Sequence, residues 1–435
     1  MNRVPLGTLA AAALLALALL LAALAWALPM MLWDHLDLVP MLAAGTPGAL
    51  ADAGFWAIHG GHLHSAAYAV LLVTSRLADG APWPDVLASW LLLVLTAAVV
   101  VGCGLRRFGR APDAPLYLAA VVVLVLHPGH LANLQWGWQV AVFLCLAGVV
   151  LALRLLTAPA PTAAGNALAL AAAAVALLSF ATALALPATA ALVLALRRDL
   201  PPRRRLALLL PWLLLGAGAL AMAWRGGTGG APAAPVELAH YVLNFLGGAL
   251  ARFATDLAPL LAAISLPVAA AAWLRHPDPA AARFWSGLLL FGLGCALLTA
   301  LGRTGAYGPE QAFATRYVSF STLYWLGLVG LLATSRSAAG GGTVQARWHR
   351  AGVAGLVVLA LATGGHVARK AARLHETTSL TAERIRQDWP EVDQALLADI
   401  YFGQAEVARE RLAVLAWMGW PPFAAAADRD SRQQP

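Results

Sequence analysis

The amino-acid sequence predicts a polytopic α-helical membrane protein, on three observations. Of its 435 residues, 61% are hydrophobic, compared with about 45–50% in soluble domains. Apolar runs long enough to cross a bilayer core, which takes about 20 residues, recur along the chain. Only 11% of the residues are charged, and the arginines gather where the apolar runs end. We therefore expect an all-α fold with about eleven transmembrane helices in one polytopic domain, residues 1–365.

The net charge of +8 does not indicate nucleic-acid binding, because arginines at the ends of apolar runs set membrane orientation instead. The three cysteines lie inside apolar runs without paired or metal-ligand spacing: Cys103, Cys145 and Cys295. They are interpreted as small core residues. The sequence contains no phosphate-binding loop, HExxH motif or nucleophile elbow, so any chemistry must come from a constellation of side chains.

The first apolar run, residues 1–28, has a signal-like start with Arg3 ahead of it. It is longer than the roughly 7–15 residues of a signal-peptide core, so we expect an uncleaved first span. The first outside loop then covers residues 29–85. Its apolar piece, residues 66–73, is too short to cross and is predicted to be an interfacial or re-entrant helix.

Residues 166–196 would form a helix of about 45 Å, which is longer than a bilayer needs, and both flanks are basic. We expect a hairpin of two short spans here, with its apex near Ser179, Phe180 and Thr182. The loop 225–259 should carry an amphipathic helix in its second half. The other crossings are expected at about 86–105, at about 116–126, up to Arg154, at about 206–224, up to Arg275, at about 284–301, up to Arg336 and at about 351–362.

This topology places most arginines on one side, which the positive-inside rule assigns to the cytoplasm. We expect a bacterial inner (cytoplasmic) membrane protein with its N-terminus in the cytoplasm and its C-terminus outside. The few outside arginines before the tail would be explained by an anionic partner: Arg76, Arg225, Arg252, Arg303 and Arg316.

The tail, residues 366–435, is no longer apolar and is predicted to be a small extracytoplasmic helical appendage. Pro390 fits the first turn of a helix that Gly403 ends, and a second helix runs up to Gly419. A module for packing or partner docking is favoured here over one that carries chemistry.

The first outside loop contains the densest polar set of the chain. Asp34 and Asp37 are three residues apart, so on a short helix both carboxylates share one face, where they suit a general base or a ligand of a sugar hydroxyl or a metal. His59, His62 and His64 follow. The alternatives for the loop are a solvated loop without chemistry and a metal site. The sequence identifies no cofactor with certainty, and a divalent metal is possible.

Two later loops add candidate binding residues. The second loop has flat tryptophan faces beside amide groups, which suits a sugar or a lipid, although a tryptophan pair at a membrane boundary is also a common anchor: Asn133, Gln135, Trp136, Trp138 and Gln139. In the third loop, Arg303 and Arg316 suit a phosphate, the alternative being an ion pair with Glu310 or an outside aspartate, and Tyr317 is adjacent.

The order of these features resembles the GT-C type of membrane glycosyltransferase. The resemblance rests on WDHLD directly after the first span, HGGHLH later in that loop, the run from Asn133 to Gln139, and the pair formed by Gly302-Arg303 and Arg316-Tyr317. It covers the spans and not the tail. It implies that Asp34 or Asp37 is the base acting on an acceptor hydroxyl, and that the sugar donor is carried on a polyprenyl phosphate or diphosphate.

The sequence thus favours an inverting glycosyltransferase with a glycan or lipid acceptor, membrane lipids around it and no nucleic-acid partner. A transporter or flippase would place polar residues at mid-span, whereas here they collect in outside loops. A polysaccharide ligase or polymerase would have its largest outside loop late in the chain. A noncatalytic scaffold is the remaining alternative.

Overall fold

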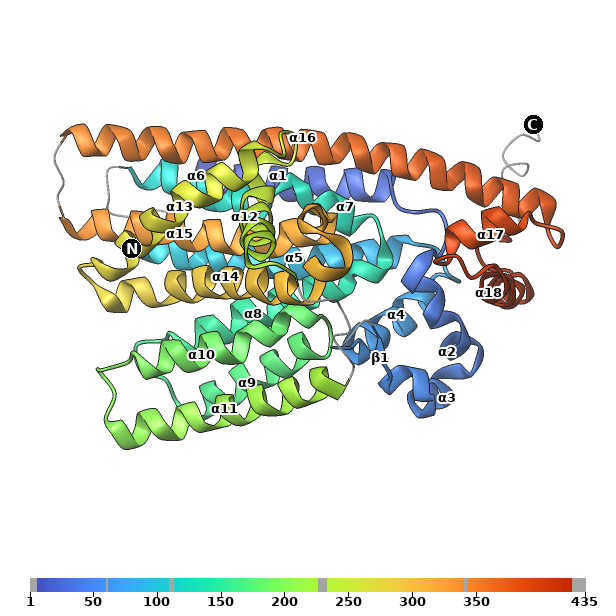
Figure 1. The fold of residues 1–435 in the computed structure, drawn as a ribbon, viewed down its shortest axis with the longest axis horizontal. Helices are drawn as coiled ribbons and strands as arrows, with labels where there is room; N and C mark the ends of the chain where they lie inside the picture. The colour runs from blue at the N-terminus through green and yellow to red at the C-terminus, as the bar shows by residue number, and fades with distance from the viewer. Residues whose placement is uncertain (1–5, 60–61, 109–112, 226–232, 340–342, 425–435) are drawn as a thin grey trace.

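The computed structural model describes residues 6–59, 62–108, 113–225, 233–339 and 343–424. The long helices run side by side along the longest axis of the molecule, and short elements gather at one end (Figure 1). In the described residues the strands are one antiparallel pair, β1 (Ile58–His59) and β2 (His62–Leu63). The all-α class expected from the sequence is confirmed.

Nine helices in the described part of the chain are long and apolar enough to cross a membrane. This confirms the polytopic architecture. They are α1 (Leu6–Ala25), α5 (Trp83–Phe108), α6 (Ala114–Val125) with its continuation to Leu134, α8 (Val140–Leu156), α11 (Pro202–Arg225), α13 (Leu257–Leu274), α14 (Pro279–Tyr307), α15 (Val318–Ala339) and α16 (Thr343–Asp388).

The expected hairpin is formed by α9 (Ala163–Leu177) and α10 (Ala185–Ala195), joined through the short helix η5 (Ala181–Leu184). Its apex rests on the first loop: the Ala66 amide donates to the Leu178 carbonyl at 3.0 Å, and the rings of His62 and Phe180 lie 5.6 Å apart. The apex backbone therefore has protein partners. With the nine long helices, the two arms account for the eleven crossings expected.

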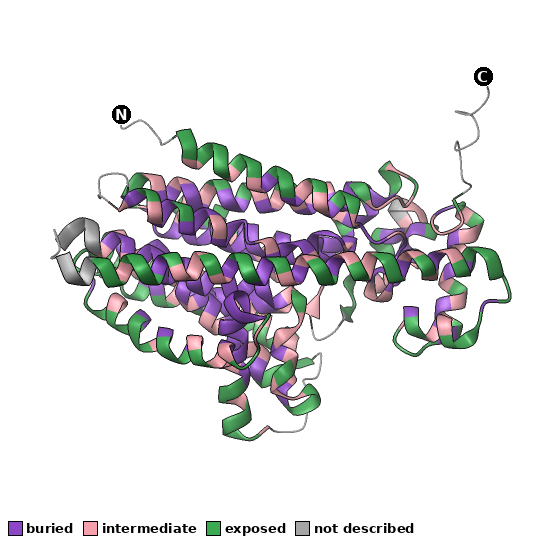
Figure 2. Cartoon of the chain, turned by 90° about the horizontal axis from the view of Figure 1, so that it is seen from above, coloured by how far each residue is buried: buried purple, intermediate pink, exposed green. Residues whose placement is uncertain are grey.

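Buried residues follow the middle of the bundle, and the outermost helices carry exposed faces (Figure 2). On α11 the exposed side is apolar: Leu206, Leu210 and Leu213 are each at least 50% exposed. Contiguous apolar surface of this kind needs a nonaqueous neighbour, which for a spanning helix is lipid.

The first loop folds into short elements at the same end of the bundle as the β pair (Figure 1). They are η1 (Trp33–Leu38), α2 (Val39–Ala43), α3 (Gly45–Ala51), η2 (Ala53–Trp56) and α4 (Ser65–Leu77). At 13 residues, α4 is too short to span and packs against α5 and α8. This end is called the site end below.

The amphipathic helix expected in the loop 225–259 is α12 (Pro235–Ala251). Tyr241, Phe245 and Ala249, four residues apart, are all buried. Figure 1 shows α12 almost end-on, so it lies across the long helices. It packs against α13, α14 and the short helix η6 (Pro309–Phe313).

The last membrane helix and the tail are continuous. α16 extends for 46 residues, from Thr343 to Asp388, and therefore runs through the expected boundary at 365/366 without a break. The tail hairpin is α17 (Gln394–Ile400) and α18 (Ala405–Met418), and Gly419 ends α18 in a left-handed conformation, φ +67°. The expectation that Pro390 begins the first helix is wrong, because Asp393 caps it by accepting from the Ala395 amide.

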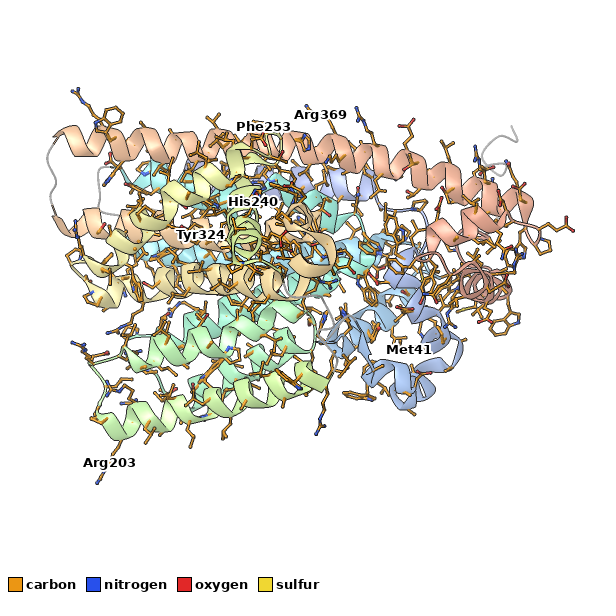
Figure 3. The ribbon with its side chains drawn as sticks, viewed as in Figure 1. Met41, Arg203, His240, Phe253, Tyr324 and Arg369 are labelled. Carbon is orange, nitrogen blue, oxygen red and sulfur yellow. The ribbon has the colours of Figure 1, made fainter. Side chains whose placement is uncertain are left out.

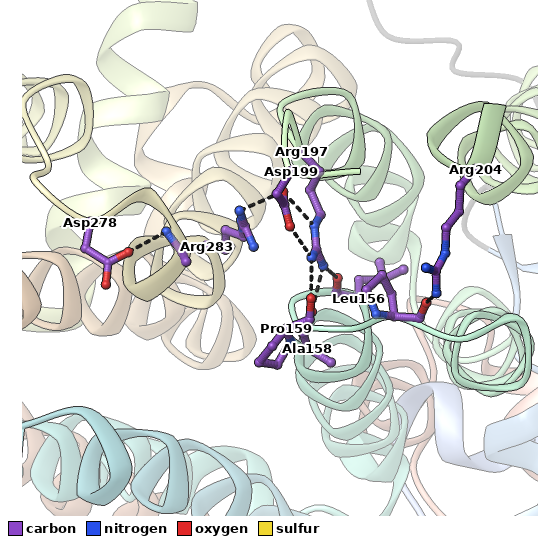
Figure 4. Close-up of polar contacts among 10 residues, drawn as sticks. Leu156, Ala158, Pro159, Arg197, Asp199, Arg204, Asp278 and Arg283 are labelled. Carbon is purple, nitrogen blue, oxygen red and sulfur yellow. Dashed lines mark hydrogen bonds and ion pairs between the residues drawn. The ribbon is translucent and has the colours of Figure 1, made fainter. Parts of the chain in front are cut away.

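The opposite end of the bundle carries the arginine clusters, and Arg203 marks it in Figure 3. Arg197 is fully buried there and donates to the carbonyls of Leu156, Ala158 and Pro159 at 3.1, 2.7 and 2.9 Å (Figure 4). Its guanidinium also pairs with Asp199 at 2.7 Å. The side chain thus joins the end of α8 to the turn after α10. This end is called the arginine end below.

Candidate active site

Asp34 and Asp37 are carried by η1, a 3-10 helix of six residues in which positions three apart lie on the same side. Both carboxylates are therefore on one face, as the sequence spacing suggests. Buried neighbours hold η1 in place, namely Leu36 and Leu38. Ahead of them Trp33 has a left-handed backbone, φ +53°, which is rare for a bulky residue and is found mainly where surrounding structure enforces it.

His35, between the two aspartates, points into the protein instead. Its Nε2 lies 3.8 Å from Asp85 at the start of α5, and both side chains are buried. Burial lowers the pKa of His35 to about 4, against a smaller raising effect of Asp34. A Cβ on Gly137 would clash with the Asp85 carboxylate, so glycine is needed for this close approach. His35 is therefore a structural anchor for η1.

His62, His64 and Trp138 form an aromatic wall beside the aspartates. The ring centroids of His62 and His64 are 4.1 Å apart, and those of His64 and Trp138 are 4.9 Å apart. Tyr68 of α4 meets Trp138 edge-on at 5.5 Å. The side chain of His59 lies outside the described residues. Within the part of the chain that is described, no three His, Cys, Asp or Glu side chains are grouped closely enough to hold a metal ion.

The side chains of the second loop lie in two places: the tryptophans contact the first loop, and the amides lie in the core. Its tryptophans meet the first loop: Trp136 contacts Trp33 edge-on at 5.2 Å, in addition to the contact of Trp138 with His64. Its amide side chains lie in the interior, with Asn133 donating to Ser319 of α15 at 2.9 Å. Gln135 and Gln139 are buried as well. The tryptophans thus contact the first loop, whereas Asn133 is engaged by α15.

The third loop gathers against α12. The guanidinium groups of Arg303 and Arg316 lie 5.7 and 5.2 Å from the rings of Tyr307 and Tyr317 respectively. Both charges act on Tyr241 of α12, so the two arginines share a neighbourhood. Tyr317 itself is buried.

A chain of rings joins this region to the first loop. Phe320, in the first turn of α15, stacks on Phe180 at 5.1 Å, and Phe180 contacts His62. The first and second loops are therefore in direct contact. The apex of the α9–α10 hairpin links the first loop to the start of α15, which follows the third loop.

A polar cavity of about 400 Å³ opens at the site end. From the first loop it is lined by Asp37, Asp52 and Tyr68, and from the tail by Tyr401 and Arg411. Met41, labelled in Figure 3, also lines it. The Tyr401 hydroxyl donates a hydrogen bond to Asp37. Asp52 is used locally, because its carboxylate accepts from the Gly54 amide at 2.6 Å and caps η2.

The same end of the bundle holds an apolar cavity of about 360 Å³. Its walls are the apex of the α9–α10 hairpin, the second half of α11 and the β pair, with His62 at its edge. Ile58 of β1 lines both cavities. The apolar cavity and the carboxylate-bearing cavity thus share one lining residue, Ile58.

Sequence reasoning missed Tyr68, Tyr401 and Arg411, and it named Arg252 only as one of the outside arginines. Arg252 is buried after α12, donates to the Ala314 carbonyl at 3.0 Å, and has no partner for its Nε among the described residues. The signal available for Arg252 was the scarcity of arginines in the outside loops. Nothing in the local pattern marks Tyr401 or Arg411, which reach the cavity only through the docking of the tail.

Comparison with known proteins supports the fold. No protein-family model and no curated protein matches the chain. Among solved structures it is similar to ArnT from Cupriavidus metallidurans bound to undecaprenyl phosphate, with 14% identity, a TM-score of 0.54, and coverage of 96% of this chain and 90% of that one. For ArnT in the apo state the values are 14%, 0.51, 88% and 80%. At the level of the fold, this confirms the polytopic α-helical architecture expected from the sequence.

Proposed function

We propose that this protein is a membrane glycosyltransferase that moves a sugar from a polyprenyl-phosphate-linked donor to a glycan or lipid acceptor. The observation that carries the proposal is the pair of cavities, one apolar and one polar, that share Ile58 as a lining residue. A lipid-linked sugar needs an apolar space for its chain directly beside a polar space for its headgroup. The ArnT structure of the same fold, which holds undecaprenyl phosphate, supports this choice of donor.

Asp37 is the proposed base, because it lines the polar cavity and Asp34 precedes it by one turn of η1. Its carboxylate takes the proton of the acceptor hydroxyl as that oxygen attacks the anomeric carbon of the sugar. The bond from this carbon to the phosphate oxygen breaks, and the lipid phosphate leaves with the electron pair. A single displacement of this kind inverts the anomeric configuration.

The departing phosphate needs cations or N–H donors. Arg303 and Arg316 are proposed for this role because both are half-buried cations of the third loop, with their guanidinium groups over the rings of Tyr307 and Tyr317. His62, His64 and Trp138 are proposed to contact the sugar, since their rings form a continuous wall between the first and second loops.

We further propose that the arginine end faces the cytoplasm and the site end the outer face of a bacterial inner membrane. The supporting observation is that Arg106, Arg154, Arg198, Arg203 and Arg283 belong to the arginine end, as the positive-inside rule requires of a cytoplasmic side. The tail, continuous with α16, would then lie outside.

The test uses full-length protein in detergent with undecaprenyl-phosphate-linked sugars, and measures the release of undecaprenyl phosphate together with glycosylated acceptor. Asp37→Asn should lower the rate by about 10²–10⁴-fold, the usual contribution of a general base. Asp34→Asn should also impair transfer, and Asp52→Asn should not remove the base because its carboxylate caps η2.

Asp79→Asn is the matched control. Asp79 is exposed with a left-handed backbone, φ +48°, a conformation that asparagine accepts readily. It should keep wild-type activity. Full activity in Asp34→Asn, Asp37→Asn and the double variant would rule out this mechanism.

A further inference from the structure

The tail forms one wall of the polar cavity rather than standing apart from it. α18 packs against α2 of the first loop, and Tyr401, between α17 and α18, donates its hydrogen bond to Asp37. Arg411, in the second turn of α18, lines the same cavity as Asp37 and Asp52. Two side chains of the tail therefore face the space where the proposed base lies.

Arg411 differs from neighbouring arginines in its partners. It is half-buried, and its Nε is enclosed by protein without a hydrogen-bond acceptor among the residues that the structure describes. Arg409, on the same helix, donates to the carbonyls of Pro390 and Val392 at 2.6 and 3.2 Å. A buried N–H without an acceptor costs free energy, and an oxygen atom of a ligand would supply what is missing.

The carboxylates of the cavity already have donors. Asp52 accepts from the Gly54 amide, and Asp37 accepts from Tyr401. Arg411 is close enough to act electrostatically on Tyr401. Its charge lowers the pKa of Tyr401, against the larger raising effects of burial and of Asp37. A planar guanidinium at the wall of an otherwise acidic cavity suits a phosphate or carboxylate.

We propose that Arg411 is an anion-binding residue of the site and holds the phosphate or carboxylate of a reactant whose reacting centre lies at Asp37. The proposal rests on the function proposed above and extends it, since it gives the tail a part in substrate binding. The anion is either the phosphate of the lipid-linked donor or an acidic group of the acceptor. Tyr401 is the positioning residue, because it acts through Asp37.

The test measures binding without sugar transfer, so that it is independent of activity. The thermal unfolding of the full chain in detergent is followed while undecaprenyl phosphate or inorganic phosphate is titrated, because a ligand of the native state raises the unfolding temperature. Arg411→Gln should need roughly ten- to a hundred-fold more of at least one probe for the same rise, the effect of losing charge-assisted hydrogen bonds. Arg411→Lys should give an intermediate response, because it keeps the charge without the planar fork.

Arg384→Gln is the control, since Arg384 is exposed on α16 and its loss changes net charge equally. It should bind both probes as the wild type does. If the effect of Arg411→Gln on inorganic phosphate disappears at saturating undecaprenyl phosphate, the anion is that of the donor. If the effect persists, the anion belongs to the acceptor.

Two outcomes would overturn the proposal: a wild type that responds to neither probe, or an Arg411→Gln variant that binds both as tightly as Arg384→Gln. Neither outcome measures sugar transfer itself, which Asp37→Asn tests separately. Conversely, Arg411-dependent phosphate binding in a protein that transfers no sugar would leave the anion site standing and remove the proposed function.

Discussion

The hydroxyl of Tyr401 donates a hydrogen bond to the carboxylate of Asp37, 364 residues earlier in the chain. Burial raises the pKa of Tyr401, and the contact with Asp37 raises it further, so the phenol stays protonated and remains a donor. The tail thus orients the residue proposed as the base.

Replacing this donor should change the pH dependence of transfer. In Tyr401→Phe the charged carboxylate of Asp37 loses a stabilising hydrogen bond, so we expect the acidic limb of the pH–rate profile to move to higher pH. The measurement is the transfer rate across pH 4–8. Tyr324→Phe is the control, because it loses a comparable bond, to Ser265 at 2.8 Å, in the helix core. An unshifted profile in Tyr401→Phe would show that the contact does not act on the base.

The docking of the tail should depend on Gly80. This residue has φ +77°, and a Cβ there would lie 2.7 Å from the indole of Trp420. Gly80→Ala should therefore loosen the tail, with faster proteolysis after α16 and reduced transfer. Gly45→Ala is the control: it has a similar φ, +75°, with open space around its Cβ position, so it bears only the backbone strain of about 1–2 kcal/mol. Equal proteolysis in the two variants would contradict the prediction.

Acid should weaken the fold through His35. Burial lowers its pKa to about 4 in the folded protein. In the unfolded chain the imidazole binds a proton near pH 6.5, whereas in the folded protein it does so only near pH 4. Stability should fall as the pH drops through this window, by at most about 3 kcal/mol. His35→Gln should lose less on acidification than the wild type, measured as the change in unfolding temperature between pH 7 and pH 5. The exposed His240 gives the control, His240→Gln, which should behave as the wild type.

Arg197→Leu should destabilise the arginine end. The substitution leaves the carbonyls of Leu156, Ala158 and Pro159 without their shared donor and the Asp199 carboxylate without its closest partner. A buried acceptor that loses its donor costs about 1–3 kcal/mol, whereas the pair with the exposed Asp199 adds little. Thermal unfolding is the measurement. Arg198→Leu, at the exposed neighbouring position, should change the unfolding temperature far less, and equal effects would show that these contacts add little.

The membrane architecture followed from the sequence because its signals are local. The apolar run of residues in α8 is long enough to cross a bilayer whatever its neighbours are. For residues 166–196, the length of the run and its basic flanks predicted the α9–α10 hairpin. The shared face of Asp34 and Asp37 was equally local, since three residues span one turn.

The cavity at Asp37 was decided by tertiary structure alone. Tyr401 and Arg411 lie on a polar tail where such residues ordinarily face water, and only the packing of α18 against α2 turns them toward the first loop. Nothing in the local sequence distinguishes Ile58 from other loop residues, and only the fold makes it a lining residue of both cavities. Periodicity and spacing report which face a side chain takes on its own element, whereas the partner of that face depends on contacts hundreds of residues away, which leave no mark on the local pattern.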